Sequence, residues 1–352
     1  MRAISIRKRG YVWAALLATL SVATLSVASV RGAVDARRSA SSLPTAPDRA
    51  SIAPNDTVTQ LQMRGVDFYV DRDIPLRIRR LRGTMRSKTG GPIMFDDKSS
   101  YIIHLDVAEI GLTGKDLSGL LNKYVLAYPG APLKRLSVST EGNEIVQKGI
   151  LHKVLDLPFE IRATLSVTPE GRIRIHPTRT EILGMHMDQV MKGLGLALDK
   201  IISLRGAKGA SLDGNDILLE PDKILPPPTI EGRVTSIRVE RDQVVQVFGQ
   251  PSSAEASTLP VPDTSAAHYM FYKGGTLRFG KLLMLDAEML IVDVDPSDPF
   301  RFDLDRYQSQ LVAGYSRTLP SGGLEVYMPD IEKVGKTRIQ VTAVPVATTS
   351  SH

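Results

Sequence analysis

The chain has 352 residues, of which 42% are hydrophobic and 5% aromatic, and it contains no cysteine. Its formal net charge of +6 arises in residues 1–38, where seven Lys or Arg residues outnumber one Asp, so residues 39–352 sum to zero. The basic balance therefore gives no argument for a nucleic-acid partner, and the absence of cysteine excludes a disulfide framework and an acylated-cysteine anchor.

Residues 1–30 have the layout of an export signal. A basic patch that includes Arg7, Lys8 and Arg9 runs into an uncharged stretch of 20 residues, Tyr11 to Val30, which is typical of a signal peptide. A stretch of this length can also cross a bilayer as a helix, so a cleaved signal and an uncleaved signal anchor both stay open. We expect the rest of the chain to work in the periplasm or another extracytoplasmic compartment.

Alternation of apolar and polar residues dominates the chain after a Pro-, Ser- and Ala-rich spacer at 31–56. The best case is Phe159 to Val167, which alternates over nine positions and ends at a turn, Thr168–Gly171. Ile173 and Ile175 resume the pattern, which predicts a hairpin with one buried face. The other predicted strands are Val66–Val70, Ile74–Ile78, Tyr101–Val107, Leu133–Val138, Glu144–Leu151, Val234–Val239, Tyr269–Tyr272, Thr276–Phe279, Ala287–Val294 and Leu324–Met328.

Three segments have helical spacing of their apolar residues. Leu117 to Val125 forms one apolar stripe behind a potential N-cap, Thr113, and a short helix is predicted between Asp303 and Tyr315. Met185 to Leu204 is apolar most of the way round although it contains two glycines. Because glycine weakens an isolated helix by about 1 kcal/mol, we expect this helix to be enclosed by other structure.

These elements together predict an α+β fold in which a highly curved antiparallel β-sheet wraps around a buried helix, with a smaller β-rich C-terminal part. A plain β-sandwich with helical connections would give almost the same pattern. The predicted organisation is a signal at 1–30, a spacer at 31–56, a curved-sheet domain at 57–249, a linker at 250–267, a β-rich subdomain at 268–336 and a disordered tail at 337–352.

The chain offers no convincing catalytic or metal-binding pattern. Its six histidines are scattered, and none forms the paired spacing that places two ligands on one helical face. Asp293 and Asp295 begin a stretch that resembles a calcium loop, but Asp298 replaces the required glycine and Leu304 the final glutamate. We therefore expect no enzyme activity, cofactor or metal, and keep a metal-dependent envelope hydrolase that uses Asp293 and Asp295 as the weakest alternative.

Two runs of charge stand out in an otherwise neutral chain. Residues 64–88 carry a net charge of +5 and residues 286–305 a net charge of −6. The two runs could dock the C-terminal part onto the N-terminal strands, the basic run could bind anionic lipid headgroups through its arginines, or both could be solvated strand faces.

From Gly149 to Gly249 the order of elements resembles the LmeA-like phospholipid-binding family of actinobacterial envelopes, and more distantly the tubular lipid-binding superfamily of the bactericidal permeability-increasing proteins. The resemblance covers about 100 of the 352 residues. It rests on Lys148–Leu151, Leu157–Leu165, Gly171–His176, Met187–Leu204 and Gly232–Val239. It implies an apolar tunnel for acyl chains beside the helix that begins at Met185.

The leading functional hypothesis is an exported, non-enzymatic envelope protein that binds a lipid or lipid-like ligand and could contact a membrane surface. Arg77 and Arg79 are candidates for binding a headgroup. A structural or interaction protein of the envelope without a ligand cavity is the alternative, and the sequence does not identify a protein partner. The candidate tunnel-lining residues are Phe159, Ile161, Leu165, Met187, Val190, Met191, Leu194 and Leu198.

Overall fold

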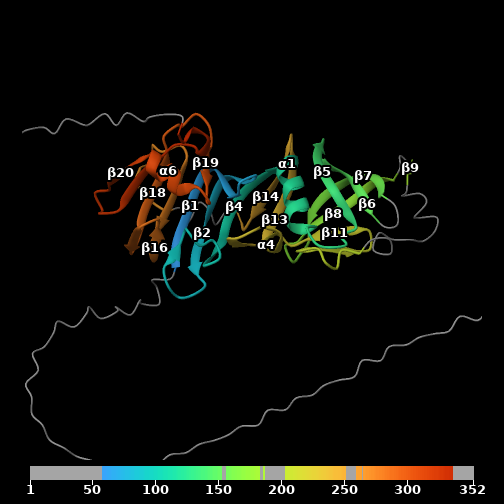
Figure 1. The fold of residues 1–352 in the computed structure, drawn as a ribbon, viewed down its shortest axis with the longest axis horizontal. Helices are drawn as coiled ribbons and strands as arrows, with labels where there is room; N and C mark the ends of the chain where they lie inside the picture. Colours follow the sequence, from blue (N-terminus) through green and yellow to red (C-terminus); the bar gives the residue numbers. More distant parts are fainter. Residues whose placement is uncertain are drawn as a thin grey trace, which may run out of the picture. The chain divides into compact units, whose positions relative to one another are not determined.

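The computed structural model describes residues 58–152, 156–182, 185–186, 203–250, 259–263 and 265–335, with backbone alone at 185–186 (Figure 1). Within these residues the chain is 57% strand and 11% helix, and the strands form three sheets. The helices in this part of the chain are short, and none of them is both long and apolar enough to span a membrane.

The large sheet has eleven strands, and its main path runs β13-β14-β4-β2-β1-β15-β18-β21-β20, with β12 beside β4 and β19 beside β1. Its strands are β1 (Val58–Asp71), β2 (Ile74–Ser87), β4 (Tyr101–Thr113), β12 (Thr229–Glu231), β13 (Val234–Glu240), β14 (Gln243–Phe248), β15 (Tyr269–Lys273), β18 (Glu288–Asp293), β19 (Phe300–Asp303), β20 (Tyr315–Thr318) and β21 (Leu324–Met328). Strands from both ends of the described chain therefore share one sheet, and the predicted linker at 250–267 falls between them.

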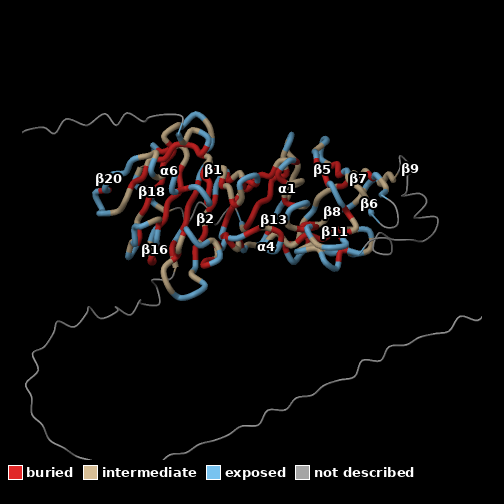
Figure 2. Tube along the Cα trace, viewed as in Figure 1, coloured by how far each residue is buried: buried red, intermediate tan, exposed pale blue. Residues whose placement is uncertain are grey.

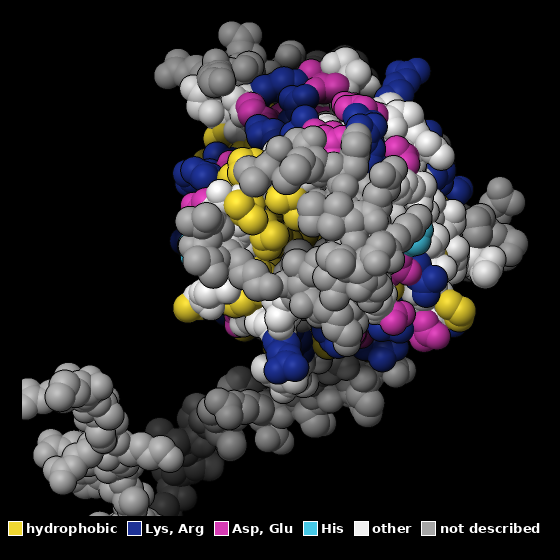
Figure 3. Space-filling view, turned by 90° about the vertical axis from the view of Figure 1, so that its right-hand side faces the viewer, with side chains coloured by type: hydrophobic (Ala, Val, Ile, Leu, Met, Phe, Trp, Pro, Cys, Tyr) yellow, Lys and Arg dark blue, Asp and Glu magenta, His cyan; other side chains and the backbone are white. Residues whose placement is uncertain are grey.

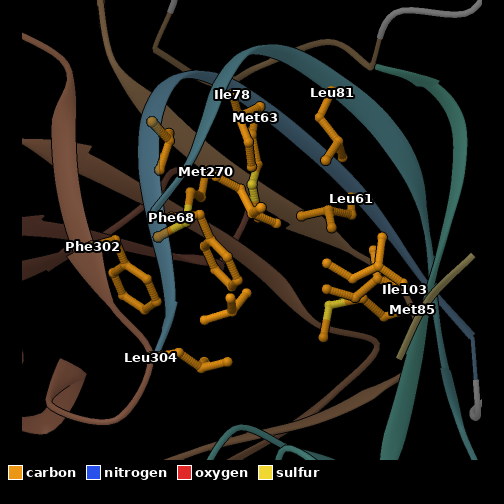
Figure 4. Close-up of a cluster of buried hydrophobic side chains, with 14 of the residues drawn as sticks. Leu61, Met63, Phe68, Ile78, Leu81, Met85, Ile103, Met270, Phe302 and Leu304 are labelled. Carbon is orange, nitrogen blue, oxygen red and sulfur yellow. The ribbon is translucent and has the colours of Figure 1, made fainter. Parts of the chain in front are cut away.

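The main core lies against the strands at the centre of the large sheet. Figure 4 shows side chains of β1, β2, β4, β15 and β19 pointing toward one another, among them Leu61, Met85 and Phe302. Each of these three side chains is at most 1% exposed. Figure 2 shows the buried positions following the strands, as expected when alternate side chains face the core.

The seven-stranded sheet has the order β10-β11-β8-β7-β6-β5, with β9 beside β8. Its strands are β5 (Leu133–Glu141), β6 (Glu144–His152), β7 (Asp156–Val167), β8 (Ile173–Ile182), β9 (Met185–His186), β10 (Ala210–Asp213) and β11 (Asp216–Leu219). The predicted hairpin is confirmed as β7 and β8. Its turn closes with the Gly171 N–H donating to the Thr168 carbonyl at 2.9 Å, and Gly171 has φ of 85°, a conformation that favours glycine.

A small sheet joins β17 (Leu282–Leu285), β16 (Thr276–Phe279) and β3 (Ile93–Met94). The described helical segments are α1 (Gly114–Leu120), the π-helical turn η2 (Leu121–Val125), α4 (Pro221–Ile224), α6 (Tyr307–Ala313) and the 3-10 turn η3 (Ile331–Lys333). The predicted helices at 117–125 and 303–315 are thus confirmed, as α1 with η2 and as α6. Each predicted strand overlaps an observed one.

The predicted fold class is wrong. None of the three sheets is closed or strongly curled, and the described residues include no long buried helix around which a sheet could wrap. Met185 and His186 form the short strand β9 instead of a helix start, and residues 187–202 of the predicted helix lie outside the described residues. The physical reason is that alternation shows that one face of a strand is covered but does not show by what. Here short helices and a second sheet supply part of the cover.

Helix α1 is fixed at its start by a capping box, as the sequence predicts for Thr113. The Asp116 N–H donates to Thr113 Oγ1 at 3.3 Å, and the Thr113 N–H donates back to Asp116 Oδ2 at 2.7 Å. Asp116 also pairs with the Arg77 guanidinium of β2, and its side chain is 3% exposed. A strand of the large sheet therefore holds the first turn of α1.

Replacing Thr113 with Ala removes the capping acceptor, and we expect the free energy of unfolding to fall by about 1 kcal/mol. Urea denaturation followed by circular dichroism measures the change. The matched control is Thr318→Ala in the exposed strand β20, which should change stability by less than about 0.5 kcal/mol. Equal effects of the two substitutions would contradict a role for the cap.

Candidate functional site

The seven-stranded sheet has one apolar face, and this face forms the floor of the candidate site. In β7 the inward positions are Phe159, Ile161, Ala163 and Leu165, as the alternation predicts. Inward residues of β5, β6, β8 and β11 extend the same hydrophobic cluster. An apolar sheet face must be buried against other elements of the fold.

Several separate parts of the chain cover this face, among them α4 through Ile224. The α1–η2 segment contributes Leu117, Leu121 and Val125, and the strands β13 and β14 of the large sheet contribute Ile237 and Val244. The helical segment and the sheet end thus meet over the same floor.

The cover leaves a cavity of about 80 Å³. All of its described lining residues are apolar except Gln147 and Gln246. In Figure 3, viewed from the side that faces right in Figure 1, hydrophobic side chains of the described residues gather at a hollow. An engineered apolar cavity of ~150 Å³ binds benzene, and drug-sized ligands occupy ~300–1,000 Å³. The space between the described residues therefore fits a short hydrocarbon segment rather than a whole lipid.

Of the predicted lining residues on β7, Leu165 borders this cavity. Phe159 and Ile161 belong to the same hydrophobic cluster, each 6% exposed, but they are not part of the cavity wall. A Cβ placed on Gly149 of β6 would lie 2.5 Å from Leu136 and 3.0 Å from the Phe159 ring. The absent side chain thus lets Phe159 pack into that space. The other predicted lining residues, Met187, Val190, Met191, Leu194 and Leu198, lie outside the described residues.

The two glutamines of the cavity were not singled out from the sequence. Gln147 is 6% exposed and Gln246 is 7% exposed, and each occupies an inward position of a strand whose inward neighbours are apolar or glycine. The sequence feature that could have revealed them is a polar residue at an inward-facing position of a strand that alternates apolar and polar residues. Gln246 also borders a second, smaller cavity of about 20 Å³, on the side of the large sheet.

The two arginines proposed for a headgroup are already paired with carboxylates. Arg77 contacts Asp116 beneath α1. Arg79 lies 2.9 Å from Glu109 and 2.6 Å from Glu240. Hydrogen bonds from Arg79 and Arg238 lower the pKa of Glu240 to about 2. Both guanidinium groups therefore join strands and a helix, which disfavours a role for Arg77 and Arg79 in binding a headgroup.

The acidic residues near the end of β18 gather around a lysine. Asp295, Asp298 and Asp330 lie close enough to share a cation, but the Lys333 ammonium contacts Asp295 and lies 2.9 Å from Asp330. A metal ion would have to displace this ammonium group. The cluster is therefore best explained as an internal ion-pair network, which disfavours the metal-hydrolase alternative.

Asp293 lies at the edge of this network and differs from the other carboxylates. It is 6% exposed. One of its oxygens accepts the Asp295 N–H at 3.0 Å, and the other has no hydrogen-bond partner among the described residues. Burial raises the pKa of Asp293 to about 7, helped by the nearby Asp330 and opposed by Lys333. This carboxyl group is thus protonated in the folded protein at mildly acidic pH.

No family model, curated protein or solved structure that was compared with the chain matches it.

The raised pKa of Asp293 makes stability depend on pH. Between pH 4 and pH 7 the Asp293 carboxyl group holds a proton in the folded state that it has lost in the unfolded state, so its contribution to the free energy of unfolding falls as pH rises, by at most about 1.4 kcal/mol per pH unit. Asn cannot ionise, so Asp293→Asn should gain stability relative to the wild type across this range and level off above pH 7. Urea titrations at several pH values measure the difference. A constant difference from pH 4 to pH 8 would contradict the raised pKa.

Proposed function

We propose that this chain is a non-enzymatic carrier that binds the hydrocarbon part of a lipid or another small apolar ligand in the cavity above the seven-stranded sheet. The observation that carries the proposal is an apolar wall interrupted by only two described polar residues. Apolar cavities of this kind stay dry, and the binding of hydrocarbon is favourable because the ligand makes van der Waals contacts that the empty space lacks.

The chemistry of the wall favours binding over catalysis. The described residues that line the cavity include no His, Asp, Glu, Lys, Ser or Thr, and therefore no nucleophile or general base. Leucine, isoleucine and valine supply contact area without charge, so the ligand is held by burial of its hydrocarbon.

We place the carrier outside the cytoplasm, on the strength of the basic patch and apolar stretch of residues 1–30. In that compartment the protein would hold acyl chains that leave a membrane. Contact with a membrane surface belongs to the same proposal, because a carrier must take up its ligand there.

A structural or interaction role remains the second candidate, and one observation favours it. The edge strand β17 exposes Leu283 and Leu285, which are 52% and 73% accessible. An exposed apolar edge is a common feature of protein contacts. Ligand-binding experiments separate the two candidates, because a protein that acts only through protein contacts is expected to bind no ligand in the cavity.

The first test is a series of n-alkyl ligands of increasing length, titrated into the intact protein. Each methylene group that leaves water contributes about 0.8 kcal/mol, so affinity should rise about fourfold per added carbon and level off once the cavity is full. Isothermal titration calorimetry measures the series. Affinity that is absent, or independent of chain length, would contradict the proposal.

The second test fills the cavity with protein atoms. Ala210 of β10 lines the cavity, and Ala210→Leu should displace about two ligand methylenes and weaken binding about fifteenfold. Ala313→Leu in α6 is the matched control, since Ala313 is a half-buried alanine that does not line the cavity. Equal affinities of the wild type and both variants would place the ligand elsewhere.

A further inference from the structure

The cavity contains two amide side chains that have no hydrogen-bond partner among the described residues. Gln147 projects from β6 of the seven-stranded sheet and Gln246 from β14 of the large sheet, so two different sheets each contribute one amide to the cavity wall. Both are more than nine-tenths buried. Neither side chain has a hydrogen bond to any other part of the protein that the structure describes.

The other buried glutamines of the protein show how unusual this is. Gln62 donates to the Tyr269 hydroxyl at 2.8 Å and accepts the Leu259 N–H at 2.9 Å. Gln310 donates to the carbonyls of Arg301 and Pro329, each at 2.9 Å, and accepts the Asp303 N–H at 2.9 Å. Among the described residues, the glutamines buried outside the cavity are therefore satisfied by protein groups, whereas the two in the cavity are not.

Buried polar groups without partners are rare because they lower stability. Leucine or methionine would fill the same positions without that penalty. On β14 the inward neighbours of Gln246, Val244 and Phe248, are indeed apolar. The presence of two such amides at one cavity is explained if a bound ligand supplies the missing hydrogen-bond partners.

The chemistry of the wall also limits what the ligand can be. No Lys, Arg or His is among the described lining residues, so a phosphate or carboxylate would be buried without a counter-charge, which is strongly unfavourable. A carboxamide both donates and accepts hydrogen bonds. It therefore suits an uncharged oxygen group.

We propose that Gln147 and Gln246 are a polar anchor that hydrogen-bonds an uncharged oxygen group, a hydroxyl or an ester carbonyl, carried by the hydrocarbon ligand of this cavity. The inference rests on the proposed function and narrows its ligand class from any hydrocarbon to neutral alcohols and esters. The anchor fixes the ligand's position, while the aliphatic wall supplies most of the affinity.

The test compares 1-pentanol with n-pentane, by calorimetry on the intact protein. We expect Gln147→Met and Gln246→Met each to weaken pentanol binding about three- to tenfold, the loss of one hydrogen bond, while pentane binds as well as before or better. Methionine is chosen because it is unbranched and adapts to the same space. Gln243→Met is the matched control, since Gln243 lies on the same strand with the opposite phase and borders neither apolar cavity.

Thermal unfolding provides the readout that separates an anchor from a structural role. The two cavity variants should melt at a higher temperature than the wild type without ligand, because an unpaired buried amide is removed; a lower melting temperature would overturn the anchor. Pentane binding with no change in pentanol affinity in either variant would also overturn the anchor and leave the proposed function intact. If neither compound binds the wild type, the proposed function itself fails.

Discussion

The structure depends on one requirement: the apolar face of the seven-stranded sheet has to be covered, and no single element among the described residues covers it. The α1–η2 segment lies over one part, β13 and β14 of the large sheet reach another, and α4 contributes Ile224. The side chains of these elements do not fill all the space above the floor at native packing density. The cavity of about 80 Å³ is the result.

Polar contacts hold the cover in position. The capping box between Thr113 and Asp116 starts α1, and the Arg77 guanidinium of β2 neutralises the Asp116 carboxylate beneath the helix. Arg79 ties β2 to Glu109 of β4 and Glu240 of β13. The basic residues that look like a headgroup site in the sequence thus join the elements around the cavity.

Stability and function make opposite demands at this site. In the C-terminal strands, Lys333 pairs with Asp295 and Asp330, and three hydrogen bonds satisfy the buried amide of Gln310. The amides of Gln147 and Gln246 receive no such support from the described residues. Proteins often leave a buried polar group without a partner where they bind a ligand. The contrast between the satisfied and the unsatisfied glutamines therefore supports the cavity as the binding site.

The sequence alone determined part of the local structure. Alternation and turn residues located most of the longer strands, including the β7–β8 hairpin, and Thr113 stands out as a helix cap, because these features depend on neighbouring residues. The sequence patterns missed β14 and short strands such as β11 and β19. It could not determine that β15 and β19 pair with β1 in one sheet, nor that short helices and a second sheet cover the apolar face in place of a long helix. It identified Leu165 at the cavity but passed over Gln147 and Gln246, since period-two spacing shows which way a side chain points and not what it meets. Only the tertiary structure brought β6 and β14 to the same cavity, because contacts between residues about 100 positions apart are set by packing and not by local pattern.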